Sequence, residues 1–200
     1  MECLMGIKCN DYVLLASDTV NLEGIIVVKV DDEKLQKLGT KLVMAVAGHK
    51  GDKTMFTQYV AKNLLLYKMR NGYEMRPHEA AHFTRKSLID FLKSKSCLVN
   101  LLIAGYDDKD GPQLFYMDYL AALADVNYAA HGYGALVSLP ILDRYYQTDM
   151  SVSDGCRLLE NCVQQVQKRL MINLSKFKIQ VIDKDGVRDL PNFTQKLLVN

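Results

Sequence analysis

Residues 41–60 read KLVMAVAGHKGDKTMFTQYV, and the spacing of the apolar residues changes within this stretch. The first part, 41–47, is almost continuously apolar, which is typical of a strand buried on both faces. The following apolar residues recur at intervals of three and four, at Met55/Phe56, Tyr59/Val60, Leu64 and Tyr67. That spacing predicts a helix, which we expect Asp52 to cap and Asn71-Gly72 to end.

Strand groups and helix pairs alternate along the rest of the chain. The predicted strands are 3–8, 12–16, 24–30, 34–37, 41–47, 98–105, 113–116, 177–182 and 187–190. The other predicted helices are one with Pro77 in its first turn, one over 134–146 that Pro140 should kink or delay, and one capped by Ser153. The order of strands, two helices, strands, two helices and strands differs from the regular alternation of a doubly wound sheet. It predicts an α+β fold, a four-layer αββα sandwich of two antiparallel sheets with helix pairs outside.

Composition limits the classes of protein to which the chain can belong. The 200 residues contain no repeat or linker, so we expect a single domain over 1–200. A net charge of +2 without a concentrated basic stripe argues against nucleic-acid binding. We see neither a signal-peptide pattern nor an apolar run near the roughly 20 residues that span a bilayer. The five cysteines follow no disulfide or zinc spacing, so the sequence predicts a soluble protein of a reducing compartment.

Eight short motifs are spread throughout the chain: MGIK (5–8), VLLASD (13–18), AGHKGD (47–52), LYKMRNGYE (66–74), LIAGYD (102–107), YMDYL (116–120), AHGYG (130–134) and LDRYY (142–146). They resemble motifs of the β subunits of the eukaryotic 20S proteasome. Each motif is weak alone, but together they follow the order and spacing of that family over nearly the whole chain. The resemblance implies the fold of the N-terminal nucleophile hydrolases, which is a four-layer αββα sandwich.

The resemblance also implies where a catalytic site would lie. In active members of the family, the hydroxyl of an N-terminal threonine attacks the peptide carbonyl and its α-amine acts as the base. A lysine and an aspartate tune this pair, and a glycine N–H stabilises the oxyanion. In this chain Lys34, Asp18 and Gly48 match those three positions, but Glu2 stands at the position of the nucleophile. A glutamate has no hydroxyl, and the first threonine in the chain is Thr19.

Two later motifs depart from the active pattern. Tyr133 replaces the serine of a Gly-Ser-Gly motif, and Leu170 replaces an aspartate further along the chain. The resemblance therefore implies a vestigial site made of Glu2, Asp18, Lys34, Gly48, Tyr133 and Leu170, with no catalytic residue and no peptidase activity.

Taken without the resemblance, the same residues have ordinary structural explanations. Asp18 after a strand is more often a turn or capping residue than a catalytic one, and Lys34 would usually be solvated. Gly48 before a helix more often meets a backbone requirement than it donates to an oxyanion. If Asp18 and Lys34 meet near the N-terminus, we expect them to form a structural ion pair.

The histidines and one cysteine suggest two other kinds of site. His78 and His82 are four residues apart on a predicted helix and could place two metal ligands on one face, but neither His49 nor His131 gives a convincing third. We therefore expect no metal and no cofactor. Cys3 is an alternative nucleophile if trimming removed Met1 and Glu2, although a bulky Glu2 should impede removal of the methionine.

The resemblance implies an architectural role in a hetero-oligomer. Expected partners are other β subunits of the same ring, α-ring subunits, the opposite β ring and assembly chaperones, with no nucleic acid and no membrane. The subunit would complete the chamber in which neighbouring threonine proteases carry out ubiquitin-dependent degradation, in the cytoplasm and nucleus. We expect the tail 191–200 at a subunit interface; Tyr116, Tyr119, Tyr145 and Tyr146 could be core residues or interface anchors. A free-standing enzyme or binding domain with the same sandwich is the other alternative.

Overall fold

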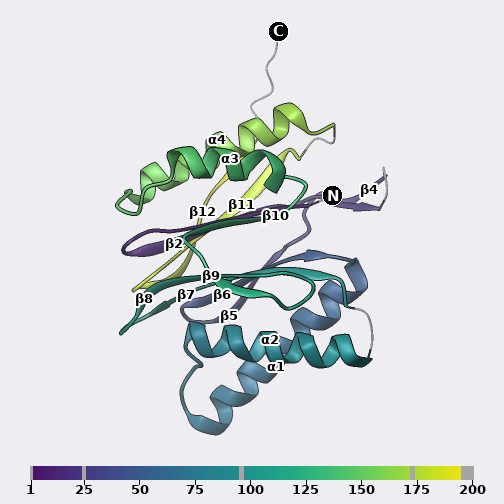
Figure 1. Cartoon of the computed structure of the whole chain (residues 1–200), viewed down its shortest axis with the longest axis vertical. Coiled ribbons are helices and arrows are strands. Elements are labelled where there is room, and N and C mark those ends of the chain that lie inside the picture. The colour runs from purple at the N-terminus through teal and green to yellow at the C-terminus, as the bar shows by residue number, and fades with distance from the viewer. Residues whose placement is uncertain (1, 24–25, 95–96, 172–173, 195–200) are drawn as a thin grey trace.

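A computed structural model of the chain describes residues 2–23, 26–94, 97–171 and 174–194. Two antiparallel five-stranded sheets lie face to face in the middle of the molecule (Figure 1). The first, in spatial order, contains β10 (Tyr128–Gly132), β1 (Cys3–Lys8), β2 (Tyr12–Asp18), β11 (Lys176–Asp183) and β12 (Gly186–Thr194). The second contains β5 (Leu35–Gly39), β6 (Leu42–Gly48), β7 (Val99–Asp107), β8 (Gly111–Met117) and β9 (Leu123–Asp125).

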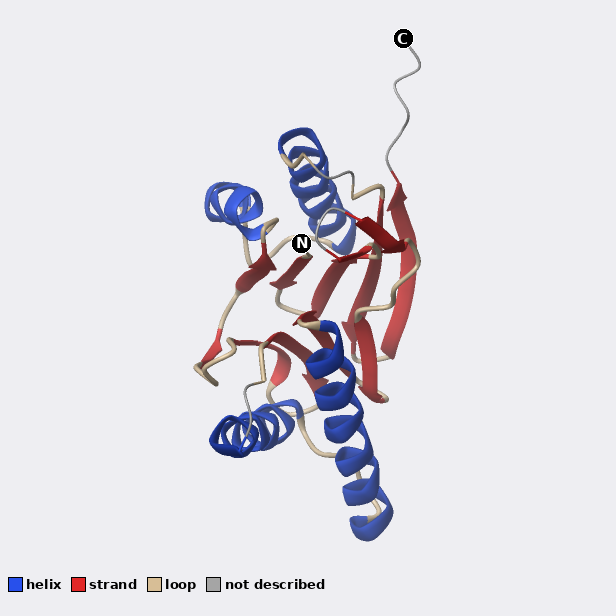
Figure 2. Cartoon of the chain, turned by 90° about the vertical axis from the view of Figure 1, so that its right-hand side faces the viewer, coloured by secondary structure: helices blue, strands red, loops and turns tan. Residues whose placement is uncertain are grey.

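Helices cover the outer face of each sheet, as Figure 2 shows from the side. The first sheet is covered by α3 (Ala135–Tyr145) and α4 (Val152–Arg169), and the second by α1 (Lys50–Asn71) and α2 (Pro77–Ser94). The predicted α+β, four-layer αββα sandwich is therefore confirmed. None of the helices in the described residues is long and apolar enough to cross a membrane.

In the described residues, three apolar cores fill the spaces between the four layers. Alternation along β1 shows how one strand serves two of them, since successive side chains of a strand point to opposite faces. Cys3, Met5 and Ile7 pack toward α3 and α4, whereas Leu4 packs between the two sheets. The third core lies between the second sheet and α1 and α2, around Phe56. Because both faces of the central strands are buried, their sequences are nearly continuously apolar.

Several predicted boundaries are wrong. The single strand over 24–30 is a short hairpin of β3 (Asn21–Glu23) and β4 (Ile26–Lys29), part of it outside the described residues. Its β-branched residues suit a strand, but the side chains of β4 are exposed instead of adding to a main sheet. The strands β9 and β10 were not predicted. Both are short segments beside turns, where periodicity gives little signal.

Two helix caps differ from the prediction. His49, not Asp52, is the N-cap residue of α1, and Asp52 accepts a hydrogen bond from the Leu98 N–H at 3.3 Å. Ser151, not Ser153, caps α4 by accepting from the Asp154 N–H at 3.2 Å. The predicted helix over 134–146 is present as α3, and of the two effects expected from Pro140 the late start does not occur, since the helix begins at Ala135.

The predicted tail 191–200 is only partly described. Residues 191–194 continue β12 as its last four residues, and 195–200 lie outside the described residues. Of the four tyrosines, Tyr116 and Tyr146 pack against core clusters, whereas Tyr119 and Tyr145 are exposed. The core explanation therefore fits two of them, and the other two are free for contacts outside this chain's own core.

Candidate functional site

Four separate segments meet at one end of the two sheets. Glu2 precedes β1, Asp18 is the last residue of β2, Lys34 directly precedes β5, and Gly48 ends β6. The antiparallel pairing of β1 with β2 brings the first two segments together, and the stacking of the sheets adds the other two. The structure thus gathers four of the six residues predicted for the vestigial site.

A buried ion pair forms the centre of this cluster. The Lys34 Nζ lies 2.6 Å from the Asp18 Oδ2, and both side chains are completely buried. Each group has further partners: Lys34 donates to the Val20 carbonyl at 2.9 Å, and Asp18 accepts from the backbone N–H groups of Cys3 at 2.7 Å and Val20 at 3.1 Å. Burial raises the pKa of the Asp18 carboxyl, and the neighbouring Lys34 ammonium opposes that shift. Such dense pairing is what a buried charge requires.

The Glu2 carboxylate lies beside this ion pair. Its Oε2 accepts a hydrogen bond from the Gly48 N–H at 2.6 Å, and its Oε1 accepts one from Lys53 at 2.9 Å. The Lys34 Nζ lies 3.6 Å from the same Oε1. The side chain at the position that the resemblance assigns to the nucleophile is therefore an anion, bound between two ammonium groups and a backbone donor.

The backbone at Gly48 has its own reason to be glycine. Its φ is +143°, and an added Cβ would lie 2.1 Å from the Leu98 carbonyl oxygen. This agrees with the structural explanation of Gly48 that the sequence allowed. Its N–H nonetheless points into the cluster, where the Glu2 carboxylate is its hydrogen-bond acceptor.

Lys53 and Asp32 complete the cluster and were missed in the sequence. The Lys53 Nζ lies 3.2 Å from the Asp32 Oδ2 in addition to its contact with Glu2. Burial alone lowers the pKa of Lys53, but the two carboxylates outweigh that effect and raise it. Lys53 lies in the first turn of α1, where the positive end of the helix dipole disfavours a cation. A lysine in that place requires an acidic partner, and this requirement could have indicated Lys53 in the sequence.

The two remaining predicted positions lie differently. Tyr133 lines a pocket of about 840 Å³ beside the cluster, together with Glu2, Gly48 and Lys53. Leu170 is not among the described residues that line this pocket; it is the C-cap residue of α4 and packs against the core between that helix and the first sheet. Where the active family pattern has an aspartate, this chain therefore has a leucine that makes apolar core contacts.

The side chain of Cys3, the alternative nucleophile, lies on the face of β1 that α3 and α4 cover. Its side chain is fully buried in the core beneath α3 and α4, against Gly134. Burial raises the pKa of its thiol, and the Asp18 carboxylate raises it further, so the reactive thiolate is disfavoured. Among the described residues, no group of three His, Cys, Asp or Glu side chains could hold a metal ion.

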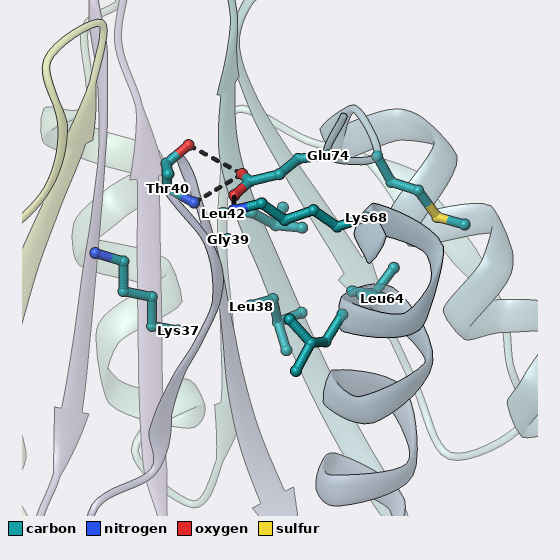
Figure 3. Close-up of a pocket in the computed structure, with 10 residues that line it drawn as sticks. Lys37, Leu38, Gly39, Thr40, Leu42, Leu64, Lys68 and Glu74 are labelled. Carbon is teal, nitrogen blue, oxygen red and sulfur yellow. Dashed lines mark hydrogen bonds and ion pairs between the residues drawn. The ribbon is translucent and has the colours of Figure 1, made fainter. Parts of the chain in front are cut away.

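A second carboxylate-centred cluster lies at the turn between β5 and β6, on a smaller pocket of about 300 Å³ (Figure 3). Glu74, in the connection between α1 and α2, accepts from the Thr40 N–H at 2.8 Å and from the Thr40 hydroxyl at 2.9 Å. Its other oxygen accepts from Lys68 at 2.8 Å. Thr40 lies in the turn between β5 and β6, and Lys68 lies on α1. The cluster therefore connects the helix pair to the second sheet.

Comparison with known proteins identifies the family. The family model described as "Proteasome subunit" matches residues 2–182. The chain is 40% identical over 189 residues to Proteasome subunit beta type-2-A of Arabidopsis thaliana, which covers 94% of this chain and 93% of that protein. It is 36% identical over 195 residues to Proteasome subunit beta type-4 of Saccharomyces cerevisiae, covering 96% of this chain and 98% of that protein. Because the family match and both alignments run through nearly the whole chain, the chain belongs to the proteasome subunit family, among its β-type members.

Proposed function

We propose that this chain is a non-catalytic subunit of the 20S proteasome core, filling the β4 position of the β ring. One observation carries the proposal: the Glu2 carboxylate accepts the Gly48 N–H at 2.6 Å. In active relatives that N–H is the donor expected to stabilise an oxyanion. Here a negatively charged side chain of the same chain already holds it, and Glu2 brings no hydroxyl to attack a peptide.

The retained Asp18 and Lys34 have a structural role in this proposal. Asp18 connects β1 to β2 through the Cys3 N–H, and Lys34 connects the segment before β5 to both Asp18 and the Val20 carbonyl. Removing Lys34 would leave the Asp18 carboxylate buried without its cation, and removing Asp18 would leave Lys34 with the Glu2 carboxylate at 3.6 Å. Such a pair supports the fold whether or not chemistry takes place beside it.

The work of the subunit is architectural in this proposal. It occupies a fixed place between neighbouring β subunits, contacts the α ring and the opposite β ring, and helps to enclose the chamber where other subunits cleave protein. Assembly chaperones would guide it into the ring, and the particle would act in ubiquitin-dependent degradation in the cytoplasm and nucleus. Membership of the family and the names of the relatives support assembly with other proteasome subunits.

The test uses the native particle. Purified core particles are treated with a peptide vinyl sulfone, which alkylates nucleophilic N-terminal threonines, and the intact mass of every ejected subunit is measured. We expect adducts on the catalytic neighbours, which serve as the internal control, and none on this chain, which should retain Glu2. An adduct on this chain, or a form trimmed to begin at Cys3, would contradict the non-catalytic assignment. A small native assembly would instead favour a free-standing protein.

A further inference from the structure

The exposed pair His78 and His82 lies on α2, away from the cluster around Glu2. The two residues are one helical turn apart, and the Nε2 atoms of their rings are 3.1 Å from each other. The ring centroids are 4.4 Å apart, with the ring planes tilted by 51°. Both residues are exposed on the surface of this chain.

This separation matches the spacing of two imidazoles on one metal ion. With metal–nitrogen bonds of about 2.0–2.1 Å, ligands at angles of about 90–110° have nitrogen atoms about 2.9–3.4 Å apart. The i, i+4 placement on a helix holds that spacing without any loop rearrangement. The Phe115 ring meets the His78 ring edge-on at 6.0 Å, which limits the orientations available to that imidazole.

The sequence alone predicted no metal here, but on this ring geometry we propose that His78 and His82 form a two-point surface chelate for a divalent transition metal of the imidazole-preferring class. Among Zn²⁺, Ni²⁺ and Cu²⁺, the ordinary affinity order places Cu²⁺ first. No third His, Cys, Asp or Glu is grouped with the pair in the described residues. Glu79, the nearest carboxylate in sequence, is engaged by Arg76 at 2.7 Å. Water therefore fills the remaining coordination positions, and the site exchanges its metal instead of serving as a closed structural site.

The competing explanation is a proton shared between the two rings, since one neutral imidazole can donate to the other. A shared proton and a bound metal use the same pair of nitrogen atoms, so geometry does not separate them. They differ in their response to metal. Chelation needs both rings at once, because the second imidazole binds within the molecule at a high effective concentration.

Copper-catalysed oxidation of assembled particles tests this site. Substoichiometric Cu²⁺ with ascorbate and hydrogen peroxide generates oxidant at bound copper, and peptide mass spectrometry locates the oxidised histidines. We expect oxidation at His78 and His82 to exceed that at His49, which is exposed but has no histidine neighbour at this spacing. Replacing one ring, His82→Gln, should lower oxidation at His78 by about tenfold or more, to the level of His49. His49→Gln, the matched control, should leave His78 unchanged.

The opposite results overturn the proposal. Oxidation of His78 and His82 no greater than that of His49 would mean that the pair shares a proton only. Unchanged oxidation of His78 in His82→Gln would mean that copper binds a single ring. The reciprocal variant His78→Gln, read at His82, gives the same test where the first variant fails to enter the particle.

Discussion

Two carboxylates in this molecule make the same kinds of contact in opposite surroundings. Asp18 accepts from the Cys3 N–H and from Lys34, and neither side chain of that ion pair is exposed. Glu74 accepts from the Thr40 N–H and from Lys68. The side chain of Glu74 is 27% exposed and that of Lys68 is 49% exposed, so both remain in contact with water. Water can replace a lost partner in the second cluster but not in the first. The same list of contacts therefore has different energetic consequences in the two places.

The largest effect should follow from removing the buried cation. Lys34→Met leaves the Asp18 carboxylate buried with no ammonium beside it, so we expect a loss of about 3–5 kcal/mol in the free energy of unfolding. Urea unfolding of the full chain, followed by circular dichroism, measures this loss. The double variant Lys34→Met/Asp18→Asn keeps an acceptor for the Cys3 N–H without the charge, and should recover much of the loss. A double variant as unstable as the single one would show that packing, not charge, causes the effect.

The next effect should come from the backbone that holds Glu2 in place. Gly132 has a φ of +81°, and an added Cβ would lie 2.0 Å from the Glu2 carbonyl oxygen. Gly132→Ala must shift that peptide and with it the Glu2 side chain, so we expect a loss of about 2–4 kcal/mol. Thermal and urea unfolding of the variant measure it.

Gly72 provides a matched control on the exposed side of the comparison. It has nearly the same φ, +82°, but nothing lies within 4 Å of its added Cβ. Gly72→Ala should therefore show only the cost of the left-handed backbone, about 1 kcal/mol. If the two alanine variants were equally unstable, the close approach of Glu2 would have no energetic weight.

The two clusters also differ in how far the sequence predicted them. Asp18, Lys34 and Gly48 were found because the family resemblance assigns them positions, and the strand order predicted the sandwich that brings them together. The direction of the Glu2 side chain and its hydrogen bond to the Gly48 N–H could not be predicted, since both depend on how the two sheets stack. Lys53 and Asp32 were missed for the same reason, and the contact between Glu74 and Thr40 was missed because it depends on how the helix pair packs on the second sheet. The caps predicted at Asp52 and Ser153 lie at His49 and Ser151 instead, because several polar residues compete for each helix terminus.

Removing the Glu2 carboxylate should have a smaller effect than the changes at Lys34 and Gly132. Glu2→Ala frees the Gly48 N–H and leaves Lys53 with Asp32 as its remaining partner. We expect a loss of about 1–2 kcal/mol, because Glu2 is partly exposed and water can enter its place. Hydrogen exchange at the Gly48 amide should also become faster, and Glu2→Gln, which keeps an acceptor, should restore part of the protection. Unchanged exchange in Glu2→Ala would contradict the hydrogen bond as the source of protection.

The smallest effect should be at Glu74, and its dependence on pH should oppose that of Asp18. Burial would raise the pKa of Glu74, but hydrogen bonds from Lys68 and Thr40 outweigh it and lower the pKa below its ordinary value. Its stabilising contribution is therefore present near neutral pH and is lost as the pH falls through the lowered pKa. We expect Glu74→Gln to cost less than about 1 kcal/mol at pH 7, and the difference from the unmodified chain to shrink in acid.

The pKa of Asp18 is raised instead, so its folded form takes up a proton at a higher pH than the unfolded chain does. The folded state then binds more protons between the ordinary pKa of Asp18 and its raised one, and stability conferred by Asp18 increases as the pH falls through that window. Unfolding measured from pH 7 down to a pH below the ordinary carboxyl pKa values should thus show the unmodified chain gaining on Asp18→Asn while it loses its advantage over Glu74→Gln. Parallel slopes for the two variants would mean that Lys34 compensates the buried carboxylate as fully as water and Lys68 compensate the exposed one.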